Sequence, residues 1–128
     1  MTILLDKCAF IWMSTDETRL SAIARSALAD PNNRRLVSAI SVLEMAIKFR
    51  LKKLKLNAPL HRAVEERMGR GVIDELPVTI EHALAVERLP LHHGDPFDRL
   101  IIAQALTENL AVITNDSQFQ KYAVPIVW

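Results

Sequence analysis

The chain has 128 residues, half of them hydrophobic, and this length fits one domain over residues 1–128 rather than two. Its 16 Lys and Arg residues balance 15 Asp and Glu residues to a formal net charge of +1, which excludes a strongly basic nucleic-acid-binding protein but not a local basic patch. The single cysteine, Cys8, excludes an intrachain disulfide, and no apolar run approaches the ~18–20 residues of a membrane span. We therefore expect a soluble, cytoplasmic protein without a membrane partner.

Short apolar runs alternate with longer helical patterns along the whole sequence. In chain order, the predicted elements are strand Thr2–Leu5, helix Leu20–Ala29, strand Leu36–Ser38, helix Ser41–Leu51, helix Pro59–Met68, strand or connector Val72–Leu76, helix Thr79–Leu89, helix Pro96–Leu106, strand Leu110–Thr114 and strand Val124–Val127. This alternation predicts an α/β layer fold with a mostly parallel central sheet.

Local signals refine several of these helices. The pattern of the first helix places Ile23 on its buried face together with Leu28. Ser41 followed by Glu44 matches a capping box for the second helix. Thr79 is a candidate cap for the fourth. Gly69 and Gly71 are expected to end the helix before them, and the helix over Pro96–Leu106 is apolar almost all round, as in a central buried helix.

Four carboxylates stand where solubility does not require them. Asp6 and Asp116 follow strand-type runs, and ligands of parallel sheets bind at the carboxyl ends of strands. Glu44 interrupts an apolar helix, and Asp98 stands at the head of the most apolar helix. Converging carboxylates repel one another, and their oxygens suit Mg²⁺ or Mn²⁺ better than Zn²⁺. Such an ion with an activated water is equipment for phosphodiester hydrolysis.

Each acid also has an ordinary structural interpretation. The structural interpretation of Glu44 is a capping-box residue, and Asp98 sits in a first helical turn, where an acid favours the helix dipole. Asp116 could be a turn residue or a cap for Ser117–Lys121. Asp6 is the hardest to explain structurally, because no turn-forming residue stands beside it.

Together these residues resemble PIN-domain ribonucleases, specifically the VapC-type toxins of VapBC toxin–antitoxin pairs. The similarity follows the expected order over nearly the whole chain, and His92–Ala105 is its most specific part. The matching stretches are Leu4-Leu5-Asp6 with Trp12, Val37-Ser38-Ala39, Glu44-Met45-Ala46-Ile47-Lys48, Leu89-Pro90-Leu91-His92-His93-Gly94-Asp95-Pro96-Phe97-Asp98-Arg99-Leu100-Ile101-Ile102-Ala103-Gln104-Ala105, and Ile113-Thr114-Asn115-Asp116 with Phe119.

The resemblance implies a PIN-like three-layer α/β/α sandwich and a Mg²⁺- or Mn²⁺-dependent endoribonuclease that forms a homodimer and is neutralised by a VapB-type antitoxin. Asp6, Glu44 and Asp98 would be metal ligands, directly or through water, and Asp116 would complete a second metal position or hold a metal-bound water. The same resemblance places Asp95 as an additional acid at the rim of the site.

Several other residues have expected roles around these acids. Thr114 matches a hydroxyl position near the site. Where the family carries Thr or Ser after the first Asp, this chain has Lys7, which is able to pair with a carboxylate and compete with metal, or to reach toward a substrate phosphate. Lys48 can pair with Glu44 at i,i+4 spacing or face the substrate. The remaining candidate substrate contacts are Arg50 and Arg99.

Some interpretations stay open at this point. The basic run Arg50, Lys52, Lys53 and Lys55 fits an RNA-contacting edge or a solvated helix end. The pair His92-His93 fits a helper near the site better than a zinc site, because no third ligand stands at a recognisable spacing. Two alternatives to the nuclease are a catalytically silent PIN-like domain that binds RNA or a partner, and a receiver-type regulatory domain.

Overall fold

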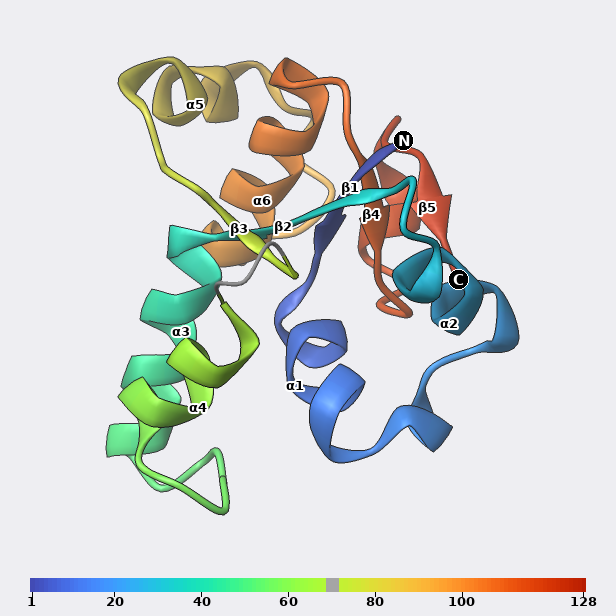
Figure 1. The fold of residues 1–128 in the computed structure, drawn as a ribbon. Helices are drawn as coiled ribbons and strands as arrows, with labels where there is room; N and C mark the ends of the chain where they lie inside the picture. Colours follow the sequence, from blue (N-terminus) through green and yellow to red (C-terminus); the bar gives the residue numbers. More distant parts are fainter. Residues whose placement is uncertain (69–71) are drawn as a thin grey trace.

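The computed structural model describes residues 1–68 and 72–128, and a five-stranded sheet lies at its centre (Figure 1). The strands stand in the order β3-β2-β1-β4-β5, and each neighbouring pair runs parallel. Their bounds are β1 (Thr2–Leu5), β2 (Arg34–Ser38), β3 (Asp74–Leu76), β4 (Ala111–Ile113) and β5 (Ile126–Val127). The first strand of the sequence is therefore the central strand of the sheet.

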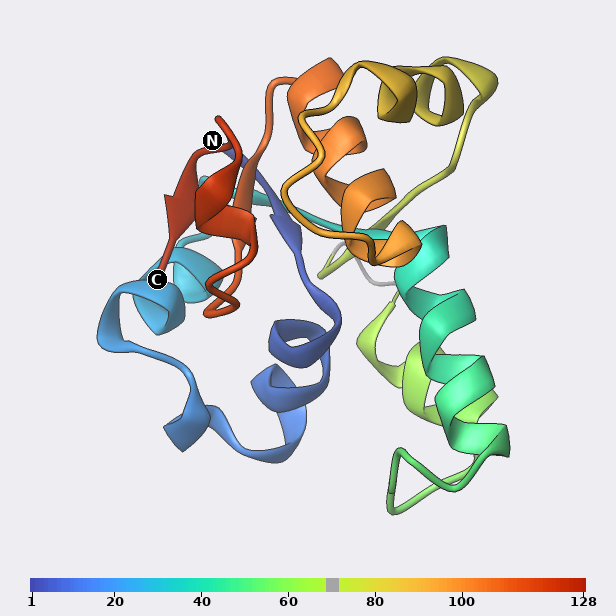
Figure 2. The same ribbon diagram turned by 180° about the vertical axis from the view of Figure 1, so that it is seen from behind.

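Six α-helices and three short 3₁₀ turns connect the described strands. Their bounds are α1 (Lys7–Thr15), η1 (Glu17–Arg19), α2 (Ala22–Ala29), α3 (Ala39–Arg50), α4 (Leu60–Arg67), α5 (Ile80–Ala85), η2 (Val86–Arg88), α6 (Pro96–Thr107) and η3 (Phe119–Lys121). In both views α3 and α4 lie side by side and extend away from the sheet (Figures 1 and 2). In the described residues, no helix has the length and apolar character needed to cross a membrane.

The core is divided between the two faces of the sheet. Ile3 and Leu5 of β1 point to one face, where they pack with residues of α1, α2 and α3. Leu4 points to the opposite face and packs with Ile101 and Ile102 of α6. This alternation of side chains along a parallel strand gives helices on both faces. The expected three-layer α/β/α arrangement is thus confirmed.

The buried face of α2 is narrower than its sequence suggested. The helix begins at Ala22 because the Ser21 hydroxyl accepts a hydrogen bond from the Ala24 amide at 3.0 Å. Ala24 and Leu28, one turn apart, are buried, whereas Ile23 is 62% exposed. The prediction that Ile23 faces the core is wrong, because one residue corresponds to about 100° of rotation around a helix.

The cap of α3 is also different from the predicted one. Ser38, at the end of β2, accepts a hydrogen bond from the Ile40 amide at 3.2 Å, so the helix starts directly after the strand. Ser41 lies inside the helix and is fully buried. The capping-box interpretation of Glu44 is therefore wrong.

Other predicted helix ends have different outcomes. The Thr79 cap is confirmed, and the helix after it changes at Val86 into the 3₁₀ turn η2. The predicted helix end at Gly69 and Gly71 lies outside the described residues.

Candidate active site

Asp6 marks the point where the strand order reverses. β1 and β4 are neighbours in the sheet but far apart in the sequence, and the Asp6 amide donates to the Ile113 carbonyl at 3.0 Å. The carboxylate of Asp6 caps α1 by accepting from the Ala9 amide at 2.7 Å. Burial raises the pKa of Asp6, and hydrogen bonds from Ala9 and the Thr114 hydroxyl oppose that rise. An acid is thus held at the position where doubly wound sheets bind ligands.

Asp116 lies close enough to influence the other acids. Its amide donates to the Thr114 hydroxyl at 3.1 Å, and one carboxylate oxygen accepts from the Gln118 amide at 2.9 Å. The turn interpretation is therefore correct as far as this local hydrogen bonding goes. The charge of Asp116 nevertheless raises the pKa of both Asp6 and Asp98. The Asp116 carboxylate thus stabilises the turn and also acts electrostatically on Asp6 and Asp98.

Asp98 lies in the first turn of α6, three residues after Asp95, which caps the helix. Asp95 accepts hydrogen bonds from the Phe97 and Asp98 amides at 2.9 and 3.1 Å. Burial raises the pKa of Asp98 to about 6, and the charges of Asp95, Asp116 and Glu44 add to this rise. Asp98 is thus close enough to these three acids for their charges to act on its ionisation.

A histidine holds the Asp98 carboxylate from the other side. Nε2 of His93 is 3.3 Å from Oδ2 of Asp98, and Nδ1 is 2.7 Å from the Tyr122 hydroxyl. This contact matches the interpretation of the His92-His93 pair as a helper near the site. The sequence analysis missed Tyr122, because nothing in a lone tyrosine of a short turn signals contact with a loop 29 residues away.

Two lysines form ion pairs with the same carboxylate oxygen of Glu44. Nζ of Lys7 is 3.1 Å from Oε2 of Glu44, and Nζ of Lys48 is 2.8 Å from the same atom. The predicted i,i+4 pair with Lys48 is confirmed, as is the ability of Lys7 to pair with a carboxylate. Contact with Glu44 is the main cause that raises the pKa of Lys48. Both lysines are therefore positive charges at the edge of the acidic site.

Arg99 does not face a substrate, contrary to expectation. It is 8% exposed, and its guanidinium donates to the Pro90 carbonyl at 2.8 Å and to the Tyr122 hydroxyl at 3.1 Å. Two further bonds reach the carbonyls of Val86 and Leu89. Arg99 thus fastens α6 to the segment before it. Arg50, the other arginine expected near substrate, is exposed at the end of α3.

A basic groove of about 400 Å³ begins at Lys7. Its lining is Lys7, Cys8, Ile11, Trp12, Thr15, Asp16, Arg19, Lys48, Lys53, Leu54, Lys55, Leu56 and Asn57. Five of these side chains are cationic. Half of the basic run considered above, Lys53 and Lys55, therefore lines a groove that reaches the acidic site.

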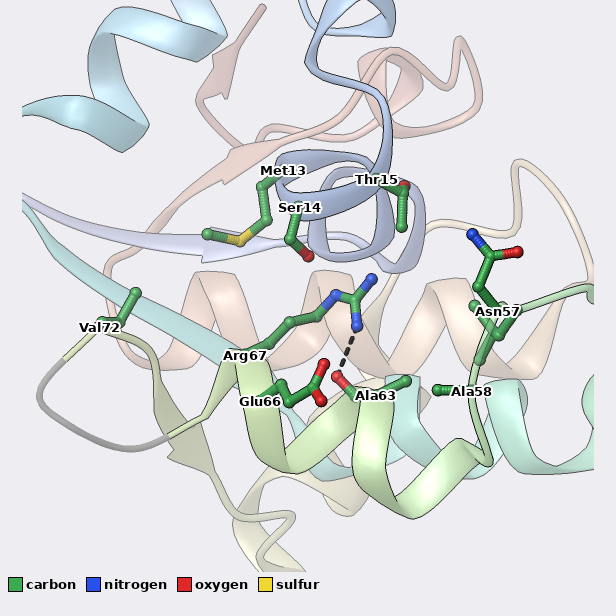
Figure 3. A pocket seen from close by; sticks show the side chains of 10 residues that line it. Met13, Ser14, Thr15, Asn57, Ala58, Ala63, Glu66, Arg67 and Val72 are labelled. Carbon is green, nitrogen blue, oxygen red and sulfur yellow. Dashed lines mark hydrogen bonds between the residues drawn. The ribbon is translucent and has the colours of Figure 1, made fainter.

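A separate cavity of about 310 Å³ lies between the end of α1 and α4 (Figure 3). Arg67 lines it, and its guanidinium donates to the carbonyls of Ala63 and Phe10 at 2.5 and 3.0 Å. Arg67 thereby joins α4 to α1. This cavity belongs to the helical packing rather than to the acidic site.

The donors of the acidic site fit a hard divalent cation in their chemistry. Asp6, Asp98 and Asp116 offer only oxygen, and burial, together with neighbouring negative charge, raises the pKa of Asp6 and Asp98, so a cation would stabilise their ionised forms. Glu44 fits less well, because its Oε2 atom already holds two ammonium groups. As the side chains lie in the described residues, no three acids, histidines or cysteines together enclose a metal position.

Comparison with known proteins gives a consistent family. A model described as the PIN domain matches residues 3–125. A curated relative, ribonuclease VapC22 of Mycobacterium tuberculosis, is 29% identical over 128 residues, which cover 97% of this chain and 94% of that protein.

Solved structures share the fold at lower identity. A chain of VapBC2 from Rickettsia felis, bound to a promoter DNA fragment, matches with a TM-score of 0.73 at 16% identity, covering 98% of this chain and 97% of that one. DNA-bound VapBC from Salmonella typhimurium matches with a TM-score of 0.67 at 18% identity, covering 98% and 96%.

Proposed function

Because the chain belongs to the PIN domain family, we propose that it is a metal-dependent endoribonuclease that acts in the cytoplasm as the toxin of a toxin–antitoxin pair. The observation that supports this proposal is the buried Asp6 at the switch point of the sheet, where its amide bonds to Ile113 of β4 and where the charge of Asp116 acts on both Asp6 and Asp98. A bound cation would offset both the burial of these carboxylates and the repulsion between them.

The carboxylates divide the work at this site. Asp6, Asp98 and Asp116 hold Mg²⁺ or Mn²⁺, which when bound supplies positive charge to a scissile phosphate and acidifies a water. Thr114 fixes the Asp6 carboxylate, and His93 fixes that of Asp98. Asp95 keeps Asp98 in register by capping α6. These neighbours restrict the rotamers of the ligands, which favours a preformed site.

The substrate is RNA, and the basic groove is its path. Lys7 and Lys48 stand between the groove and the acids, so an RNA strand contacting Lys53 and Lys55 passes the site. Trp12 offers a ring in the same groove. With a net charge of only +1, this local patch is the main source of attraction for phosphates.

The protein partners follow from the toxin role. A VapB-type antitoxin neutralises the chain, and two copies of the chain form a homodimer. VapBC assemblies are the known context of the structural relatives.

The decisive experiment incubates the purified chain with total RNA, with and without Mg²⁺ or Mn²⁺. Asp6→Asn and Asp98→Asn are expected to lose cleavage and growth inhibition by at least ~100-fold, since even groups that only orient metal ligands contribute about 10–100-fold. Asn at position 6 still offers an oxygen to the Ala9 amide, so the fold is expected to persist. Asp74→Asn, an exposed acid paired with Arg34, is the matched control.

A second candidate is a catalytically silent PIN domain that binds RNA, and the Lys7–Glu44 ion pair favours it. The same experiment separates the two functions. Metal-dependent cutting that both variants lack supports the nuclease. RNA binding without cutting, unchanged by metal and by either variant, contradicts the nuclease and supports the silent domain.

A further inference from the structure

The buried Glu44 carboxylate pairs with two ammonium groups, although one would balance its charge. The Nζ atoms of Lys7 and Lys48 are 3.1 and 2.8 Å from the same oxygen of Glu44, whose side chain is only 9% exposed. Lys48 balances Glu44 from the next turn of the same helix. The ammonium group of Lys7 is therefore a surplus charge as far as Glu44 is concerned.

The local position of Lys7 is unfavourable for a cation. It is the first residue of α1, where the helix dipole favours negative charge. Its side chain is 19% exposed, so the ammonium group has also lost much of its hydration. A rotamer pointing to solvent would avoid that desolvation. The buried orientation instead places the ammonium group against Glu44, directly after Asp6 in the chain.

We propose that the ammonium group of Lys7 replaces one of the divalent cations expected at the acidic site, so that this chain binds a single ion through Asp6, Asp98 and Asp116. The inference rests on the proposed nuclease function and assigns Glu44 to the lysines instead of to an ion. An ammonium group is a compact cation with three hydrogen-bond donors. It supplies positive charge to a carboxylate or a phosphate without needing a complete set of ligands.

The substitution that tests this role is Lys7→Thr, because Thr or Ser is the residue expected after the first Asp. Lys7→Thr leaves Glu44 with Lys48 alone and removes the cation that lies between α1 and α3. The net charge of the acids and the remaining lysine then becomes more negative. Because like charges repel, removal of this ammonium group makes room electrostatically for a second ion.

The experiment titrates the full chain with Mn²⁺ and follows free Mn²⁺ by electron paramagnetic resonance, in the absence of RNA. The wild type is expected to bind one Mn²⁺ per chain. Lys7→Thr is expected to bind a second ion, or to bind the first about tenfold more tightly, as expected for removal of one nearby positive charge.

Two variants serve as matched controls. Lys7→Arg keeps the positive charge and is expected to bind one Mn²⁺ per chain, as the wild type does. Lys53→Thr removes a positive charge from an exposed position of the same groove and is expected to change neither stoichiometry nor affinity.

The outcomes also separate this inference from the proposed function. Two Mn²⁺ ions on the wild type, or identical titrations of the wild type and Lys7→Thr, would overturn the role of Lys7 alone. Asp98→Asn is expected to abolish binding in both backgrounds. If Mn²⁺ binds equally well to Asp98→Asn, or does not bind to the wild type, the acidic site is not a metal site and both proposals fail.

Discussion

At the scale of single residues, Asp98 links the charge of the site to the stability of the fold. Its pKa is about 6, against an ordinary value of 3.8, because burial and three neighbouring acids disfavour its ionised form. Between these values the folded chain binds more protons than the unfolded chain, so the stability falls as the pH rises through this window. A shift of this size corresponds to at most about 3 kcal/mol, and partial exposure of the side chain reduces it.

We therefore expect the metal-free chain to lose unfolding free energy between about pH 4 and pH 6.5, and the Asp98→Asn variant to lose less. Urea unfolding at several pH values measures this difference. Mg²⁺ is expected to stabilise the wild type more at pH ~7.5 than at pH ~5.5, because protons compete with the ion for the carboxylates. Equal pH dependence of the two proteins would show that the repulsion around Asp98 is not real.

The sequence identified these acids through their position relative to strands and helices. Asp6 and Asp116 follow apolar runs, which is a local signal. The pairing of Lys48 with Glu44 is likewise local. The ion pair between Lys7 and Glu44 joins residues 37 positions apart, and it depends on how α1 packs beside α3. Spacing along the chain carries no information about such a contact.

At the scale of elements, the orientation of α6 depends on a buried arginine. Arg99 donates to the carbonyls of Pro90, Val86 and Leu89 and to the Tyr122 hydroxyl. Val86 begins η2, and Leu89 and Pro90 follow that turn, so these carbonyls lie in the segment between α5 and α6. The same tyrosine holds His93 against Asp98, so the packing of α6 and the position of a site carboxylate are joined.

Substitution of Arg99→Met is expected to lower the unfolding free energy by about 2–4 kcal/mol, because it leaves buried carbonyls without a donor. Thermal denaturation measures this loss. Arg50→Met, at an exposed end of α3, is the control and is expected to change stability by less than about 0.5 kcal/mol. Unchanged stability of Arg99→Met with weaker RNA binding would instead support the substrate role expected from the sequence.

Element types were easier to predict than element ends. Apolar runs of strand length predicted β1, β2, β4 and β5, whereas β3, with Asp74 and Glu75 exposed, was left open between a strand and a connector. The helix α1 was not predicted. The start of α3 was misplaced because Ser38 and Ser41 are both good caps, and only the end of β2 decides between them. The role of Arg99 could not be predicted because an arginine beside an acid looks the same in the sequence whether it is buried or exposed.

At the scale of the whole molecule, the expected homodimer requires an apolar contact surface. Leu43, Ile47 and Leu51 recur every fourth residue from α3 into its end and are 50%, 42% and 57% exposed. Such a row of exposed apolar side chains on one helix face favours association.

We expect the purified chain to be a dimer and Ile47→Asp to shift it toward a monomer by at least tenfold in dissociation constant, because a carboxylate would be buried in the contact. Light scattering coupled to gel filtration measures the mass of both. Ile80→Asp, on the exposed face of α5, is the control. A dimer that Ile47→Asp leaves intact would place the contact on another face.

The central position of β1 has a consequence for a chain that is still being synthesised. The first strand to leave the ribosome pairs with β2 on one side, but its other neighbour, β4, begins only at Ala111. Asp6 is therefore made early and Asp116 late, and their meeting requires β4 to dock on β1. A nascent chain, or a fragment ending before β4, carries most of the acids without the assembled site. Under the proposed function, a prematurely terminated chain would thus lack nuclease activity, and activity would appear only when synthesis is nearly finished.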